Sequence, residues 1–106
     1  RSIYFDFDSF VIRDEFRGLI EGHAKGLAAG KGKRMVVEGH TDERGGREYN
    51  LALGQKRADA VVKAMTLVGA PADRLEAVSF GKERPAVEGR DEASWAKNRR
   101  AELKDK

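Results

Sequence analysis

The chain contains no cysteine and only two prolines among its 106 residues. The lack of thiols excludes a disulfide framework and any thiolate metal site. No apolar run approaches the roughly 20 residues that a membrane-spanning helix needs. Basic side chains number 21 and acidic ones 18, so the formal net charge is only +3, and the two signs are interspersed. This balance gives little support for nucleic-acid binding, although the sequence pI near 9.3 permits it.

Apolar residues recur at regular spacings, which predicts a single folded domain over residues 1–106. Strict alternation at the start predicts a strand in which Phe7 faces the same side as Ile3 and Phe5. Three glycines spaced four residues apart in the first helix indicate close packing along one side. Expected strands cover residues 2–8, 34–38, 75–80 and 99–104; expected helices cover 13–29, 48–68 and 91–97, the last capped by Asp91. This order predicts an α/β two-layer sandwich with helices packed on a sheet.

The second long helix carries one charged residue on its apolar stripe. On a helical wheel, Arg57 lies about 20° from Asn50, among core-facing residues such as Leu53. A guanidinium in that position is costly unless it is paired. Arg57 therefore either forms a structural salt bridge with Asp42 or projects into a polar cleft where the core opens, and the two arrangements are compatible.

Other charged residues are expected near the same place. Asp42 follows the second strand and Asp8 ends the first. Arg99 opens the last strand, with alternation placing it on the core side and Arg100 on the exposed side. Converging Asp and Arg side chains would suit a zwitterion, with an ammonium against Asp and a carboxylate forked onto Arg57.

Metal and catalytic chemistry have weak support. The two histidines, His23 and His40, make a poor zinc set without cysteine, and His23 is expected in or beside the core. Arginine neighbours should keep the carboxylates ionised, and no serine has a nearby histidine to activate it. We expect no metal, no cofactor and no catalytic residue. Trp95 is expected to cap the core or to line the cleft beside Arg99.

Four sequence blocks resemble the OmpA-like C-terminal domain family, and the resemblance covers nearly the whole chain. They are residues 5–8 (FDFD), 39–45 (GHTDERG), 49–58 (YNLALGQKRA) and 98–101 (NRRA). Within that family, the loop sequence is most similar to the peptidoglycan-associated lipoproteins, the Pal branch. The resemblance implies the fold β-α-β-α-β-(short α)-β, with two long helices on a mixed four-stranded sheet.

The resemblance also implies a function. Members bind peptidoglycan non-covalently through the meso-diaminopimelate residue of the stem peptide, and they are not enzymes. The principal ligand residues carry over as Asp42 and Arg57. Further pocket positions are Asn50, Leu53, Arg99 and Asp8, and Arg44 lies in a loop expected to contact the peptide through its backbone. Gly46 departs from the Ser or Thr that the resemblance implies there, so the resemblance does not predict a side-chain contact at this position.

By the same resemblance, the full protein would lie on the periplasmic side of the outer membrane and link it to the cell wall within the Tol-Pal system. Its expected protein partner is the periplasmic propeller protein of the Tol system. The lipid-bearing N-terminal segment would be missing, because the chain begins at Arg1 in a strand-like run. A monomer is expected. A porin-type or flagellar-stator-type protein carrying the same module, a peptidoglycan hydrolase and a nucleic-acid binder remain as alternatives.

Overall fold

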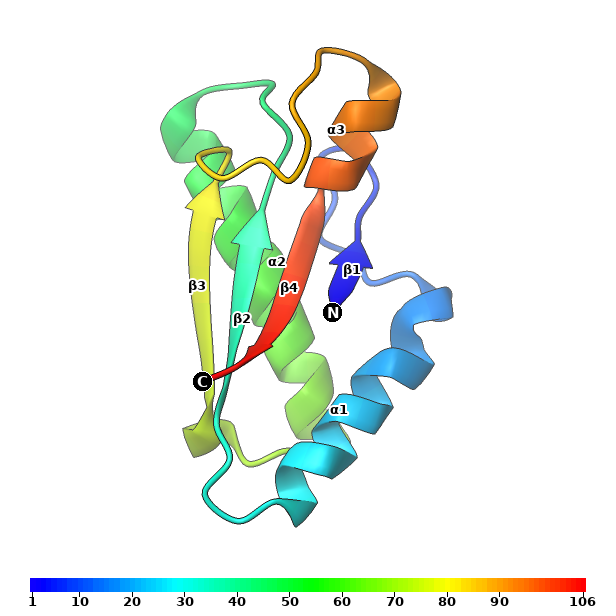
Figure 1. The fold of residues 1–106 in the computed structure, drawn as a ribbon, viewed down its shortest axis with the longest axis vertical. Helices are drawn as coiled ribbons and strands as arrows, with labels where there is room; N and C mark the ends of the chain where they lie inside the picture. The colour runs from blue at the N-terminus through cyan, green and yellow to red at the C-terminus, as the bar shows by residue number, and fades with distance from the viewer.

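A computed structural model describes all residues from Arg1 to Lys106. The chain forms one four-stranded sheet with two long helices against it (Figure 1). The strands are β1 (Ser2–Tyr4), β2 (Met35–His40), β3 (Leu75–Gly81) and β4 (Arg100–Asp105); the helices are α1 (Arg17–Ala29), α2 (Arg47–Leu67) and α3 (Glu92–Asn98), with 3-10 turns η1 (Asp14–Phe16) and η2 (Ala72–Arg74). The expected two-layer sandwich is confirmed. None of the helices combines the length and hydrophobicity needed to span a bilayer.

The sheet has the strand order β1-β4-β2-β3. β2 and β3 are parallel, whereas β4 runs antiparallel to both β1 and β2. The carboxyl ends of β1, β2 and β3 and the amino end of β4 therefore meet at one end of the sheet, the upper end in Figure 1. Loops that are far apart in the sequence become neighbours there.

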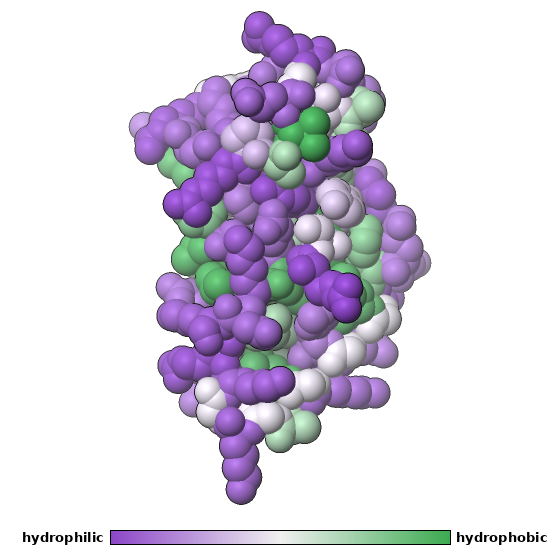
Figure 2. Space-filling model, in the orientation of Figure 1, coloured by the Kyte–Doolittle hydropathy of each residue, from purple (hydrophilic) through white to green (hydrophobic).

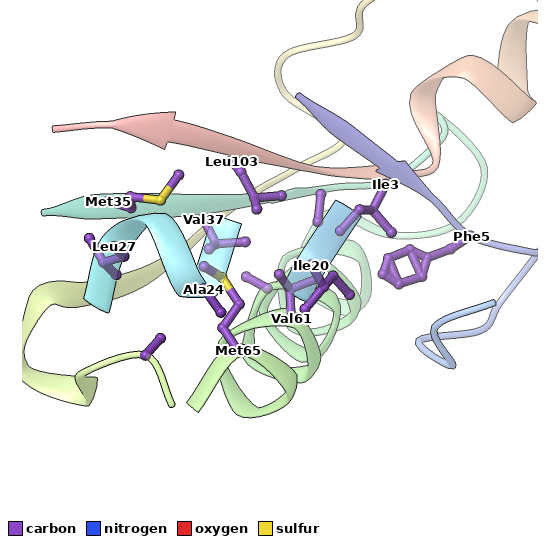
Figure 3. Close-up of a cluster of buried hydrophobic side chains, with 13 residues drawn as sticks. Ile3, Phe5, Ile20, Ala24, Leu27, Met35, Val37, Val61, Met65 and Leu103 are labelled. Carbon is purple, nitrogen blue, oxygen red and sulfur yellow. The ribbon is translucent and has the colours of Figure 1, made fainter. Parts of the chain in front are cut away.

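The hydrophobic core lies between the sheet and helices α1 and α2 (Figure 3). Alternate strand residues face it, because successive side chains in a strand point to opposite faces. Each fully buried aliphatic or Phe side chain contributes about 1.5–3 kcal/mol. The main contributors are Ile3, Phe5, Val37 and Leu103 from the sheet side and Ile20, Ala24, Leu27, Val61 and Met65 from the helices.

Helix α2 lies unusually close to β2. A Cβ atom on Gly39 would stand 1.7 Å from the carbonyl oxygen of Gly54, so the backbones touch where neither residue has a side chain. The buried face of α2 includes Leu53 and Arg57, as the helical wheel predicts. Because Arg57 follows Gly54 by one turn, this contact fixes its position over the end of the sheet.

The first strand is shorter than the sequence pattern predicts. Pairing stops at Tyr4, although the N–H of Phe5 still donates to the carbonyl of Arg99 at 2.9 Å. The chain then turns, and Asp8 adopts a left-handed conformation with φ 54°. Phe7 is consequently 59% exposed instead of facing the core, so that expectation was wrong.

The three glycines of α1 do not mark a close contact. A Cβ atom on Gly18, Gly22 or Gly26 would meet nothing within 4 Å, so the predicted packing along that side is wrong. The helix buries Ile20 and Leu27 on its opposite side instead. Its first predicted turn is the separate 3-10 turn η1, so α1 begins later than the periodicity suggests.

The sheet face away from the helices carries a buried charge cluster. Arg100 does lie on the side of Glu102, but it is only 4% exposed, so its predicted exposure was wrong. Its Nε is 2.5 Å from the Glu102 carboxylate. His40 lies beside this pair, 2% exposed and stacked on Phe80 with ring centroids 5.6 Å apart. Glu38 is 3.6 Å from His40 Nε2.

Candidate functional site

A cavity of about 210 Å³ opens among the loops at the end of the sheet where the carboxyl ends of β1 and β2 meet. Three segments form it: the turn after β1, the β2–α2 loop and the first turns of α2. Their meeting follows from the topology, which brings these strand ends and the start of α2 together. The lining residues are Phe7, Asp8, Thr41, Asp42, Arg44, Gly45, Tyr49, Asn50, Leu53 and Arg57.

Arg57 is wholly buried and lines this cavity. Its Nε donates to the carbonyl of Ser9 at 2.8 Å, Nη1 to that of His40 at 2.9 Å and Nη2 to that of Asp6 at 3.2 Å. Burial lowers the pKa of Arg57 to about 10, and the nearby Asp42 charge opposes the shift. The guanidinium is thus cationic at neutral pH. The alternative of a structural salt bridge to Asp42 is wrong, because the two side chains make no ion pair within 4.0 Å and Arg57 donates to backbone carbonyls instead.

Asp42 is 4% exposed and is held by another arginine. Its Oδ1 accepts from the backbone N–H of Arg44 at 2.9 Å and from Nε at 3.2 Å, and its Oδ2 accepts from Nη2 at 2.8 Å. Burial opposes ionisation of Asp42, but these hydrogen bonds outweigh it and lower the pKa of the carboxyl. The cavity therefore contains a fixed carboxylate.

Arg44 is clamped between two aromatic rings. Its guanidinium carbon is 4.1 Å from the ring centroid of Phe7 and 4.0 Å from that of Trp95. Such stacking holds a cation over the ring faces and joins three segments of chain. Phe7 was not predicted at the site, because the strand pattern placed it in the core. Trp95, which was predicted to cap the core or to line the cleft beside Arg99, contacts this arginine at the edge of the site.

Asn50 and Leu53 lie on the cavity wall, as the resemblance implies. The Nδ2 of Asn50 donates to the carbonyl of Arg44 at 2.8 Å, which fixes the β2–α2 loop against the helix. Gly45 follows with φ 93°, a conformation that glycine adopts readily. Leu53, three residues after Asn50 on the buried face of α2, supplies an apolar part of the wall and is 8% exposed.

Asp8 is also on the wall, together with a residue that the sequence analysis did not select. The hydroxyl of Tyr49 donates to Asp8 Oδ1. This hydrogen bond raises the pKa of Tyr49, because ionisation of the phenol would place a second negative charge beside the carboxylate. The position of Tyr49 one residue before Asn50 could have indicated that Tyr49 belongs to the site, since the first turn of a helix faces the loop that precedes the helix.

Arg99 does not line the cavity. It lies between α3 and β4, so the prediction that it opens the last strand was wrong. Its Nε donates to the carbonyl of Phe5 at 3.0 Å, and its Nη2 contacts Glu92 at 2.8 Å. Its Nη1 lies 3.7 Å from Asp42 Oδ2. Arg99 therefore supports the carboxylate of Asp42 from behind and lies outside the cavity.

The site combines one buried cation with one buried anion on the same small cavity. The structure provides acceptors for three of the five N–H groups of Arg57, which leaves two for a ligand. Asp42 has about four lone pairs and accepts three hydrogen bonds, all from Arg44, so one position on Oδ2 remains. This arrangement can hold a small group that carries both a carboxylate and an ammonium.

Comparison with known proteins agrees with this architecture. Residues 4–99 match the OmpA family. The peptidoglycan-associated lipoprotein of Pseudomonas aeruginosa is 53% identical over 103 residues, which cover 97% of this chain and 61% of the relative. That of Pasteurella multocida is 49% identical, with 96% of this chain and 68% of the relative covered. The chain thus spans about three fifths to two thirds of the length of these relatives.

Solved structures agree with the sequence relatives. The crystal structure of the peptidoglycan-associated lipoprotein from Burkholderia pseudomallei superposes with a TM-score of 0.98 at 52% identity, over 100% of this chain and 90% of that one. The C-terminal domain of Helicobacter pylori MotB shares the fold, with a TM-score of 0.90 at 24% identity over 100% of this chain and 84% of that one. This chain therefore belongs to the OmpA family and is a homologue of the peptidoglycan-associated lipoproteins.

Proposed function

We propose that this domain binds peptidoglycan non-covalently by gripping the meso-diaminopimelate residue of the stem peptide. The observation that carries the proposal is that Asp42 and Arg57 line one cavity and keep opposite charges while both are buried. Diaminopimelate offers an ammonium and a carboxylate on one carbon at its free end. The ammonium would occupy the open position on Asp42, and the carboxylate would take the two uncommitted N–H groups of Arg57.

The remaining walls suit the rest of such a ligand. Leu53 can contact the methylene chain between the two centres of diaminopimelate, and Asn50 holds the loop that carries Arg44. Asp8 and Tyr49 form the rim on the side of the β1 turn. In this proposal Arg99 acts only through Asp42, by stabilising its charge from behind. Binding needs no proton transfer and no nucleophile, so the domain works as a binding module.

The cellular role is proposed from the relatives. As a piece of a peptidoglycan-associated lipoprotein, the domain would hold the cell wall while a lipid anchor outside residues 1–106 holds the outer membrane. It would then act from the periplasmic side in the Tol-Pal system, as a monomer, with the Tol propeller protein as its partner. The names of the relatives at 49–53% identity favour this context over a porin-type or stator-type protein.

Titration with two synthetic stem tetrapeptides tests the proposal, one containing meso-diaminopimelate and the other lysine at the same position. Lysine keeps an ammonium but lacks the distal carboxylate, so Arg57 would be left buried with unpaired N–H groups. We expect the lysine peptide to bind roughly 5- to 150-fold more weakly, since such a loss costs about 1–3 kcal/mol. Equal affinities for the two peptides would refute the assignment.

The matched variants are Asp42→Asn and Glu43→Gln, which remove one negative charge each from adjacent positions of the same loop. Asp42 is buried on the cavity wall, whereas Glu43 is exposed and contacts Arg90 at 3.0 Å. Asp42→Asn should abolish sedimentation with purified peptidoglycan, and Glu43→Gln should sediment like the wild type. Release of soluble fragments from the peptidoglycan would instead indicate a hydrolase.

A further inference from the structure

The end of the molecule farthest from the cavity carries a group of exposed cations. The α1–β2 connection contributes Lys31, Lys33 and Arg34, and the turn η2 contributes Arg74, which is partly exposed. We call these four residues the basic pole. It forms the lower end of the molecule in Figure 1, and long hydrophilic side chains project from this end in Figure 2. The longest dimension of the molecule, 42 Å, runs between the two ends.

The charges of the basic pole are not neutralised within the protein. No carboxylate oxygen lies within 4.0 Å of any of the four cationic groups. Arg34 donates to the backbone carbonyl of Asp73 at 3.3 Å, and Arg74 donates to that of Gly30 at 2.5 Å, so both side chains are positioned without losing their charge.

At the cavity end of the molecule, three arginines are paired with acids: Arg44 contacts Asp42 at 2.8 Å, Arg47 contacts Glu83 at 3.5 Å, and Arg90 contacts Glu43 at 3.0 Å. Other cations there are not paired with acids: Arg57 and Lys82 donate to backbone carbonyls.

The shape of the basic pole suggests the chemistry of its partner. A shallow groove of about 270 Å³ is lined by three cations, Arg34, Arg74 and Lys106, and by two acids, Asp73 and Glu76. Lys106 is paired to Glu76 at 2.5 Å, which leaves the two arginines as the free cations of the groove. Donors on two arginines that hydrogen bonds hold in place, beside exposed lysines, suit phosphate groups spread over a surface. None of the groove residues is aromatic, so the groove has no platform on which nucleic-acid bases could stack.

We infer that the basic pole docks on a membrane surface that contains anionic phospholipid. Lysines and arginines close to such a surface are attracted over roughly a Debye length, about 8 Å at physiological salt. The cavity lies much farther away, so docking leaves it free and directed away from the membrane. This orientation rests on the proposed function, because it assigns one end of the domain to the membrane and the other to the cell wall. The docking of the basic pole on the membrane does not depend on the proposed function.

Vesicle co-sedimentation tests the inference, with vesicles of phosphatidylglycerol and phosphatidylethanolamine against vesicles of phosphatidylcholine alone. The domain should bind the anionic vesicles at low salt, lose binding as salt rises, and ignore the neutral ones. The double variant Lys31→Gln/Lys33→Gln should reduce the partition coefficient by about tenfold or more. Both lysines are exposed, and neither side chain makes a hydrogen bond, so the fold should persist.

The matched control is Lys56→Gln/Lys97→Gln, which removes two exposed lysines away from the basic pole and gives the same net charge. It should change the partition coefficient less than twofold. Equal losses in the two double variants would overturn the inference, as would tighter binding to a DNA duplex than to anionic vesicles. Lys31→Gln/Lys33→Gln should still bind the diaminopimelate peptide normally, so failure of the membrane inference and failure of the wall proposal give different results.

Discussion

Among single residues, Arg57 is the largest side chain that is fully buried, and it also lines the cavity. Its guanidinium donates to three carbonyls from two separate segments and lies 5.3 Å from the ring centroid of Phe5. We expect Arg57→Ala to destabilise the fold by about 3 kcal/mol or more, because it leaves buried carbonyls without donors and opens a cavity. Urea unfolding at neutral pH measures this loss.

The control for that prediction is Arg47→Ala, at the exposed start of the same helix. Its contact with Glu83 is 3.5 Å long and solvent-exposed, so its removal should change the free energy of unfolding by less than about 0.5 kcal/mol. Similar losses in the two variants would mean that the carbonyl contacts of Arg57 contribute little to stability.

The sequence predicted where Arg57 points but not what it contacts. Helical periodicity alone places it on the buried face, and the structure confirms that placement. Its partners are backbone carbonyls, however, and the positions of carbonyls in a turn have no side-chain signature. Arg44 shows the same limit: its family position was recognised, but its stacking between Phe7 and Trp95 depends on a turn that strand alternation could not predict.

Among secondary-structure elements, the contact between β2 and α2 positions the site. Gly39→Ala would drive a methyl group into the Gly54 carbonyl, so the helix must move away from the strand. We expect a loss of about 1–3 kcal/mol in stability, as for other overpacked positions, and weaker peptide binding because Arg57 moves with the helix. Thermal unfolding and titration with the diaminopimelate peptide report the two effects separately.

A glycine of α1 offers the matched control. Gly22→Ala introduces the same methyl group where nothing lies within 4 Å, in a helix that gains from alanine. It should stabilise the fold by about 0.5–1 kcal/mol and leave peptide affinity unchanged. Destabilisation by Gly22→Ala would show that this side of α1 has a contact that the structure does not contain.

The outer face of the sheet makes stability depend on pH through His40. Burial lowers its pKa, and Arg100 acts in the same direction, whereas Glu102 and Glu38 oppose the shift. In the unfolded chain this histidine has a pKa of about 6.5. Between that pH and the lower folded pKa, the unfolded state therefore binds a proton that the folded state does not bind. The contribution of His40 to the free energy of unfolding is complete above about pH 6.5 and decreases as the pH drops toward the folded pKa.

We expect the melting temperature of the wild type to fall between pH 7 and pH 5.5 and this fall to shrink in His40→Gln. His23→Gln is the comparison, because burial also lowers the pKa of His23, but that side chain is only half-buried. It should remove a smaller part of the pH dependence. An unchanged slope in His40→Gln would assign the effect to other groups.

For the whole molecule, the order of elements was predictable because its periodicities are clear, while depth of burial was not. Arg100 shows why: alternation correctly gives its side of the strand, but that side is covered locally by Glu102 and by the chain after β3, whose Arg84 carbonyl accepts from it at 3.2 Å. The cavity could be anticipated only as a convergence of charges. Its walls depend on turns that bring Asp8 and Tyr49 together.

Ligand binding should stabilise the whole domain, because the cavity is formed by segments that come together only on folding. A diaminopimelate tetrapeptide at ten times its Kd adds about 1.4 kcal/mol by mass action. For a chain of this size that raises the melting temperature by on the order of 5 °C. The lysine peptide at the same concentration should give little shift, and Asp42→Asn should give none with either peptide. A shift that persists in Asp42→Asn would place the binding site elsewhere on the molecule.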